Sequence, residues 1–346
     1  MIEISIDVLI RGIILLSAFL IFVCIYLSIR RGIEVAHLQK KEMYIKETQT
    51  LWYRYLRDEI SFTRKLNPKD KFEIQGLEEI FLVYIKHLSN ESIQNKISQF
   101  SNHHLKRHYQ KKLKSRKWSS RMNAMYRIID FYMDSLVNDC KALKARKLSP
   151  EEQFLLLKIY STFDPKEFIK EFLSLTVAFS EFEYKKLLAG VSHKILEELL
   201  IRFDEFPLNV QCSIIDILGI KRNAEYLTFL EWRLQNENKE IRIRSLKAIY
   251  EVGIILDFNK YKPFIDSPIW EERLIMAKLL GVLPLSDSSL HLEKLLTDQS
   301  WWVRSQAAMT IGKYKDGEKL LTQVILENTD SFAADMANAV LKKGVY

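Results

Sequence analysis

The chain has 346 residues, 48% of them hydrophobic, with only 10 Gly and 7 Pro. This composition is sufficient for a large core and poor in turn residues, which favours an all-α fold. Three Cys, too few and too scattered, exclude a disulfide framework and suit a reducing compartment.

An apolar run opens the chain. Gly12 to Ile29 are 18 residues without a charge, long enough to span a bilayer. A cleaved signal peptide is the alternative, but Glu3 and Asp7 stand where such peptides are basic, and no small-residue cleavage site follows the run. We therefore interpret residues 1–31 as an uncleaved transmembrane anchor.

Charges on either side of this run predict its orientation. Arg11 alone precedes it, whereas four basic residues follow it, namely Arg30, Arg31, Lys40 and Lys41. Because basic residues concentrate on the cytoplasmic side of a membrane, we expect a single-pass protein of the cell membrane with a cytoplasmic C-terminal part.

Residues 32–90 are predicted to form juxtamembrane helices. One long helix is expected from Ile33 to about Leu66, ended by Pro68, and a second from Phe72 to Leu88. The apolar positions of the first do not keep a strict heptad, so we expect it to pack on the domain rather than form a long coiled coil.

Residues 91–206 are predicted to be basic and irregular helical repeats. A helix is expected from Ile93 to Leu113, and others lie in residues 150–161, 165–178 and 181–203. The segment Trp118 to Tyr132 has the same pattern as the later repeats, with Arg121 at its basic position.

Ser92 to Ile129 contain no acidic residue and ten Lys and Arg, whereas the whole chain carries a net charge of only +8. This window is either a solvated surface or a site for an anionic partner, such as the inner membrane leaflet or an acidic protein surface. We do not favour nucleic acid as the partner, because we expect the chain to be anchored in a membrane. The candidate residues are Lys106, Arg107, Lys111, Lys112, Lys114, Arg116 and Lys117.

Residues 207–346 are predicted to be regular repeats. Gln211, Arg242, Arg273 and Arg304 are spaced by 31 residues, and apart from Ser245 the residues three, four and seven positions after each of them are apolar. The preceding segments share a second apolar pattern, which indicates two helices per repeat. Because neither helix buries its apolar face alone, the repeats must stack, which predicts an α-solenoid behind the N-terminal transmembrane helix.

The best-formed repeat resembles the HEAT-like repeat family. Its Asp, Val-Arg, Ala-Ala and Ile-Gly positions are occupied by Asp298, Val303, Arg304, Ala307, Ala308, Ile311 and Gly312. Earlier repeats depart from this pattern, since Gln211 replaces the Arg, and Asn236 and Ser267 replace the Asp. We expect Arg242, Arg273 and Arg304 to form a structural ladder that hydrogen-bonds to loop carbonyls or to carboxylates of the neighbouring repeat.

Catalytic motifs are missing from the sequence: it has no Gly-rich phosphate loop, paired-Cys metal spacing or nucleophile elbow. His104 and His108 share the spacing of a metal pair, but cations surround them and no acidic residue or Cys lies close in sequence. We expect no enzyme activity, metal, cofactor or small-molecule substrate.

Our first hypothesis is a membrane-tethered, non-enzymatic scaffold that binds a partner protein at the cytoplasmic membrane face. The chain resembles bacterial membrane-anchored HEAT-repeat proteins, and the resemblance implies an accessory of a membrane glycosyltransferase or a surface-polysaccharide system. The alternative is an enzyme built on HEAT-like repeats, similar to a DNA glycosylase or a chromophore lyase, that uses a basic groove.

Overall fold

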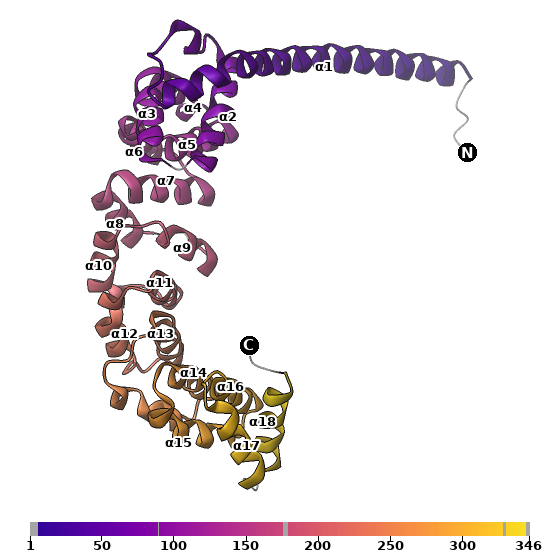
Figure 1. Ribbon diagram of the computed structural model, residues 1–346. Helices are drawn as coiled ribbons and strands as arrows, with labels where there is room; N and C mark the ends of the chain where they lie inside the picture. The colour runs from indigo at the N-terminus through magenta and orange to yellow at the C-terminus, as the bar shows by residue number, and fades with distance from the viewer. Residues whose placement is uncertain (1–5, 89, 176–178, 328–329, 344–346) are drawn as a thin grey trace. The chain divides into compact units, whose positions relative to one another are not determined.

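The protein is all-helical. The computed structural model describes residues 6–88, 90–175, 179–327 and 330–343, and within these ranges it contains 18 α-helices and no strand (Figure 1). The predicted all-α class is therefore confirmed.

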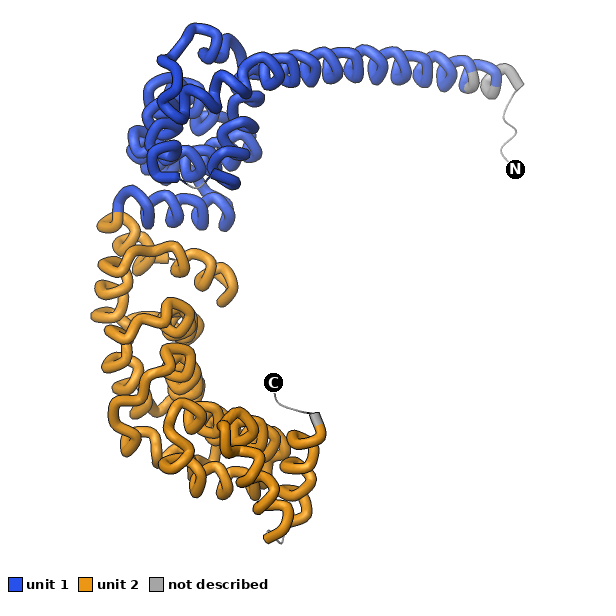
Figure 2. The backbone as a smooth tube through the Cα atoms, viewed as in Figure 1, with its two compact units in different colours: residues 1–164 blue, residues 165–346 orange. Residues whose placement is uncertain are grey.

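The chain divides into two compact units, residues 1–164 and residues 165–346 (Figure 2). The first unit contains 28 Lys and Arg against 18 Asp and Glu, and the second contains 24 against 26. The positive net charge of the protein thus resides in the first unit.

Helix α1 (Ile6–Leu56) continues from the apolar run into the folded part of the first unit without a break. The prediction that this helix reaches Leu66 is wrong. Asp58 has a φ of 62°, in the left-handed region that a right-handed helix cannot pass through, and only a short 3₁₀ helix, Arg64–Leu66, follows. The last turns of α1 carry the fully buried Trp52.

The first unit contains six more helices, of which the first two pack on α1: α2 (Lys71–His87), α3 (Glu91–Phe100), α4 (Lys106–Leu113), α5 (Trp118–Asp130), α6 (Val137–Lys141) and α7 (Pro150–Phe163). Side-chain caps explain several starts, because Asp70, Asn90 and Ser149 accept hydrogen bonds from the first backbone N–H groups of α2, α3 and α7.

A π-helical turn, Ser101–Leu105, separates α3 from α4, so the expected helix from Ile93 to Leu113 is interrupted. Within this turn Asn102 donates to the carbonyl oxygen of Tyr132 at 3.1 Å and accepts from the backbone N–H of Ser135 at 3.1 Å. The wider turn therefore holds a side chain that ties α3 to the loop after α5.

The second unit contains α8 (Pro165–Leu173), α9 (Glu181–Leu188), α10 (His193–Ile201), α11 (Leu208–Lys221), α12 (Leu227–Arg233), α13 (Lys239–Val252), α14 (Trp270–Leu279), α15 (Leu285–Leu296), α16 (Trp301–Gly312), α17 (Gly317–Glu327) and α18 (Ser331–Lys343). Helices α9, α11, α13, α14, α16 and α18 each pack on the next one in this order (Figure 1). Helices α12, α15 and α17 pack on α13, α16 and α18 respectively.

Two helix predictions in the second unit need correction. The expected segment 181–203 breaks between α9 and α10, where Ser192 caps the new helix. The first segment of the repeat around Tyr261 is not an α-helix but two 3₁₀ helices, Phe258–Lys260 and Lys262–Asp266. Pro263 lacks the N–H that an α-helix needs there. Helix α8 ends at Leu173, and residues 176–178 of its expected range lie outside the described residues.

Small residues bring α11 and α13 into close contact. A Cβ on Gly219 would lie 2.9 Å from Cα of Ala248, closer than such atoms approach in proteins. Gly281 occupies the equivalent position of the repeat pattern, and a Cβ on Gly281 would lie 2.9 Å from Cγ2 of Thr310 in α16. The Gly of the repeat pattern thus permits helix–helix packing at these two positions.

Replacing Gly219 by Ala should therefore lower the free energy of unfolding by about 1–3 kcal/mol, because α11 and α13 must move apart. Urea denaturation followed by circular dichroism measures the change. Gly190→Ala is the control, since its Cβ would meet only the carbonyl oxygen of Leu187 at 4.0 Å. Equal stability of the two variants would contradict the close packing.

Candidate functional site

The N-terminal half of α1 is the most exposed apolar feature of the protein. Eleven large apolar side chains between residues 14 and 29 are 53–72% exposed, and no described residue covers them. Among the described residues, α1 is the one helix long and apolar enough to cross a membrane. Its contacts with the rest of the first unit begin at His37, whose ring stacks on Phe72 with centroids 3.8 Å apart.

Arg242 lies at the start of α13 and joins this helix to α14. Its Nη1 donates to the carbonyl oxygens of Asn236 and Glu237, both at 2.8 Å, in the turn before its own helix. Its Nε donates to Glu272 Oε1 at 2.8 Å, at the start of α14. The Glu272 side chain is only 2% exposed, so the guanidinium neutralises a buried carboxylate.

The next two members of the predicted ladder occupy equivalent places. Arg273 donates to the carbonyl oxygen of Ser267 at 2.6 Å and forms two bonds with the Asp298 carboxylate, at 2.5 and 2.9 Å. Arg304 donates to the carbonyl oxygen of Asp298 at 2.7 Å, and its Cζ lies 5.1 Å from the centre of the Phe332 ring. The starts of α14, α16 and α18 are therefore adjacent.

The same contacts appear around Arg121, at the start of α5 in the first unit. Arg121 donates to the carbonyl oxygen of Ser115 at 3.0 Å and to Glu152 of α7 at 2.6 Å. Gln211, which replaces the Arg in α11, makes only the backward contact among the described residues, to the carbonyl oxygen of Phe203 at 3.1 Å. Each of these side chains forms hydrogen bonds within the protein, as a structural role requires.

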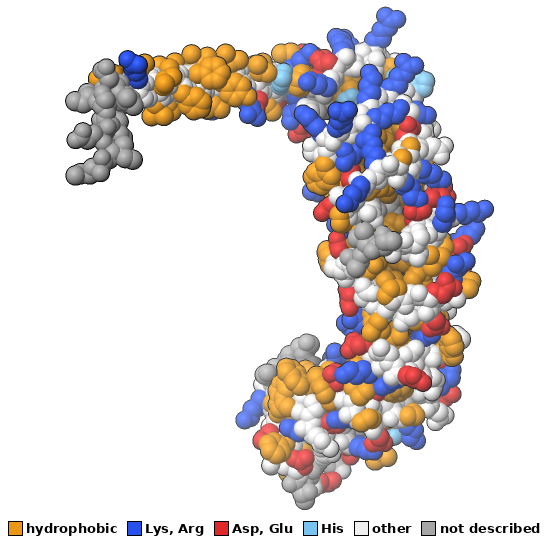
Figure 3. Space-filling view, turned by 180° about the vertical axis from the view of Figure 1, so that it is seen from behind, with side chains coloured by type: hydrophobic (Ala, Val, Ile, Leu, Met, Phe, Trp, Pro, Cys, Tyr) orange, Lys and Arg blue, Asp and Glu red, His pale blue; other side chains and the backbone are white. Residues whose placement is uncertain are grey.

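The basic surface consists of Lys106, Arg107, Lys111, Lys112, Lys114, Arg116 and Lys117, on α4 and the turn before α5. Five of these side chains are exposed, and Lys106 and Lys112 are half-buried. Lys112 pairs with Glu78 at 3.4 Å, whereas the other six form no ion pair with any described residue. Figure 3 shows Lys and Arg side chains gathered over the first unit.

The two histidines of the predicted metal spacing have different surroundings. The His104 ring stacks on Phe100 at 4.4 Å and on Phe62 at 5.3 Å between centroids. Burial, together with the nearby Lys112, lowers the pKa of His108 to about 4. Partial burial and the neighbouring His103 lower the pKa of His104, and of these two rings His104 is exposed and His108 is half-buried. Within the described ranges no group of three or more His, Cys, Asp or Glu is arranged to hold a metal ion.

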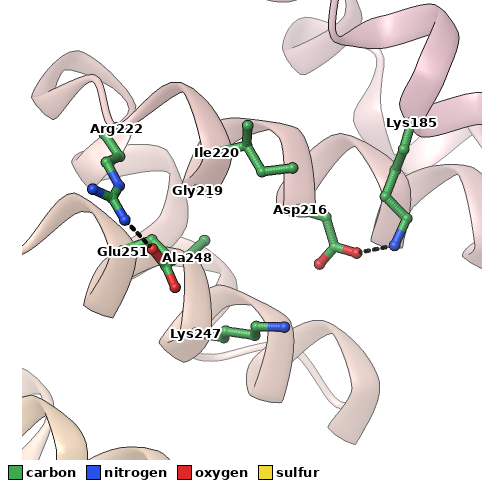
Figure 4. Close-up of a pocket in the computed structure, with 8 residues that line it drawn as sticks. All are labelled: Lys185, Asp216, Gly219, Ile220, Arg222, Lys247, Ala248 and Glu251. Atoms are coloured by element: carbon green, nitrogen blue, oxygen red, sulfur yellow. Dashed lines mark hydrogen bonds and ion pairs between the residues drawn. The ribbon is translucent and has the colours of Figure 1, made fainter.

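A hollow of about 520 Å³ opens between α9, α11 and α13 in the second unit (Figure 4). Its sides carry the ion pairs Lys185–Asp216, at 2.8 Å, and Arg222–Glu251, at 2.7 Å. Lys247 points between these pairs in Figure 4. Both carboxylates that line the hollow are therefore held in ion pairs.

Tyr261 has a role that the sequence did not indicate. It occupies an apolar position of the repeat, and its ring is fully buried, but its hydroxyl donates to Glu231 Oε1 at 2.6 Å. Burial and the Glu231 carboxylate raise the pKa of this phenol. Lys260 binds the other oxygen of the same carboxylate at 2.5 Å. The one signal in the sequence was that a Tyr occupies a position at which the other repeats have Leu.

No protein-family model matches this chain, and no curated protein matches it. The HEAT-like assignment therefore stays a prediction that rests on the residue pattern.

Proposed function

We propose that the protein is a membrane-tethered scaffold: α1 anchors it in a bilayer, and its helical repeats bind a partner protein on the cytoplasmic side. The observation that carries this proposal is the exposed apolar half of α1. Removing apolar surface from water is worth roughly 25 cal/mol per Å², so a helix with side chains more than half exposed is strongly favoured to enter lipid.

The continuity of α1 supports a short and stiff tether. His37, where α1 meets the rest of the first unit, lies eight positions after Ile29, at the end of the apolar run. At 1.5 Å per residue this is about 12 Å, compared with a screening length of about 8 Å for charges in physiological salt. Such a tether keeps the first unit near the headgroups, where its excess of Lys and Arg is attracted to anionic lipids.

The succession of helices in the second unit supports an α-solenoid of HEAT-like repeats. Each helix that begins with a ladder position packs on the next such helix, and Arg242 and Arg273 bond from one repeat to the following one. Solenoids present long surfaces to other proteins. The resemblance to bacterial membrane-anchored HEAT-repeat proteins suggests a membrane glycosyltransferase or a surface-polysaccharide system as the partner.

Deletion of residues 1–31 tests the anchor. The truncated chain should move completely from the membrane fraction to the soluble fraction, because the deletion removes the apolar run and none of the contacts that begin at His37. Fractionation after an alkaline wash, with circular dichroism of the released protein, gives the result. A truncated chain that stays with the membrane as an integral protein would refute the anchor.

Substitution of exposed positive charges tests the contribution of the basic surface. With each Lys or Arg worth about 1 kcal/mol at an anionic surface, five changes to Gln should weaken vesicle binding on the order of 100-fold or more. Co-sedimentation of the truncated protein with phosphatidylglycerol vesicles measures this effect. The five positions are Arg107, Lys111, Lys114, Arg116 and Lys117.

The matched control carries five Lys→Gln changes at exposed positions of the second unit and should bind as the parent does. If both sets weaken binding equally, the effect is one of net charge, and the basic surface has no special part. The control positions are Lys239, Lys247, Lys313, Lys315 and Lys319.

A further inference from the structure

Four exposed aromatic residues stand at the starts of α14, α16 and α18 in the second unit. We call Trp270, Trp301, Trp302 and Phe332 the aromatic edge. Their exposed fractions are 38%, 49%, 60% and 61% respectively. Large aromatic side chains are highly buried on average, so a set of them left in water at equivalent places in consecutive repeats marks an interaction surface.

The ladder shows that these residues form one continuous edge. Trp270 lies one turn before Arg273, which binds Asp298 in the turn just before Trp301. Arg304, one turn after Trp301, lies 5.1 Å from the Phe332 ring. The rings of Trp301 and Trp302 are 4.8 Å apart and nearly perpendicular.

Acidic residues outnumber basic residues along the edge, which also carries the ladder residues Arg273 and Arg304. The turns and helix starts that carry the four aromatic residues are residues 264–272, 296–303 and 330–335, and together they contain six Asp and Glu and no Lys or Arg. Asp298 and Glu272 are bound by ladder arginines, and Asp266 pairs with Lys294. Glu271, next to Trp270, forms no ion pair with any residue that the structure describes. The edge thus combines aromatic faces with a small excess of carboxylates.

We propose that the aromatic edge binds a Lys- and Arg-rich amphipathic segment of a partner protein. Cations prefer the face of an indole ring, and Trp is the side chain most enriched among residues that dominate binding energy. The second unit already uses this contact internally, since the Arg233 guanidinium lies 4.2 Å from the Trp232 ring. Apolar residues of the same segment would cover the remaining ring surface.

An anionic bilayer is a poorer occupant of this edge, because the carboxylates would be repelled by its headgroups. If the protein is anchored as proposed above, on which this step rests, its nearest protein neighbours are other membrane proteins. Their cytoplasmic segments beside a membrane span are rich in Lys and Arg. We therefore place the binding segment next to a span of the partner.

The test uses the full-length protein in detergent micelles and a labelled 18-residue peptide of Leu and Lys in amphipathic helical order. Fluorescence anisotropy should show binding that weakens with added salt, and the same peptide with Glu in place of Lys should bind at least tenfold more weakly. The double variant Trp301→Ala/Trp302→Ala should bind the Lys peptide at least tenfold more weakly than the parent.

Leu290→Ala is the matched control, because Leu290 is 75% exposed on α15 and lies away from the edge. It should leave the affinity unchanged. Thermal melts by circular dichroism check that the Trp variant keeps its fold, as expected for exposed side chains. Equal binding of the Lys and Glu peptides, or of parent and Trp variant, would overturn the proposal.

A bilayer contact is distinguished in nanodiscs made with brominated lipid. If the edge lay on the membrane, the lipid would quench Trp301 and Trp302, and the double variant would show clearly less quenching. That result would also overturn the proposal. The peptide assay is done in detergent and does not depend on the anchor. If the protein does not bind the Lys peptide, but deletion of residues 1–31 still releases it from the membrane, this inference is rejected and the proposed anchor is not.

Discussion

Replacing Trp52 by Ala should lower the free energy of unfolding of the first unit by about 3–5 kcal/mol. Its ring is fully buried and lies edge-on to Phe81 and Phe100, with centroids 4.9 and 4.8 Å apart. Its indole N–H donates to the Tyr44 hydroxyl at 3.2 Å. The substitution would leave a cavity and free the end of α1 from α2 and α3.

Urea denaturation followed by tryptophan fluorescence and circular dichroism gives this change. Trp302→Ala is the control, because the same substitution at a side chain that is 60% exposed removes little packing and should cost less than about 1 kcal/mol. Similar losses in the two variants would contradict the placement of Trp52 at the centre of the first unit.

Replacing Arg273 by Ala should lower the free energy of unfolding of the second unit by about 3–5 kcal/mol, because it leaves a buried carboxylate without its cation. The Asp298 side chain is 8% exposed and receives two bonds from Arg273. The carbonyl oxygen of Ser267 would also lose a donor. Urea denaturation followed by circular dichroism measures the loss.

Two controls separate the ladder from ordinary surface pairs. Arg222→Ala removes an arginine that is 67% exposed and pairs with Glu251 at 2.7 Å, and it should cost less than about 1 kcal/mol. The double variant Arg273→Ala/Asp298→Ala should be more stable than Arg273→Ala alone, because the unpaired charge is gone. If Arg273→Ala were as stable as the parent, the ladder would not hold the repeats together.

Periodicity made much of the second unit predictable. The spacing of 31 residues between Gln211, Arg242, Arg273 and Arg304 identified the starts of α11, α13, α14 and α16, because an amphipathic helix must repeat its apolar positions every three to four residues. The pattern failed around Tyr261, where Pro263 prevents α-helical hydrogen bonding. At that point the missing N–H of one residue outweighed the helix pattern of the repeat.

The candidate surfaces were predictable to different degrees. The apolar run and the basic surface are continuous in sequence, so both could be recognised without coordinates. The aromatic edge could not, because Trp270, Trp301 and Phe332 are about 30 residues apart, and a Trp in an amphipathic pattern is usually buried. Exposure is a property of the folded chain.

The sequence by itself determined the helical class and the length of the apolar segment, because each depends on residues close together along the chain. The tertiary structure decided the end of α1 at Leu56, the π-helical turn after α3 and the carboxylates that Arg242 and Arg273 bind. These depend on which distant side chains meet, and Glu272 and Asp298 were indistinguishable from other acidic residues until the helices packed.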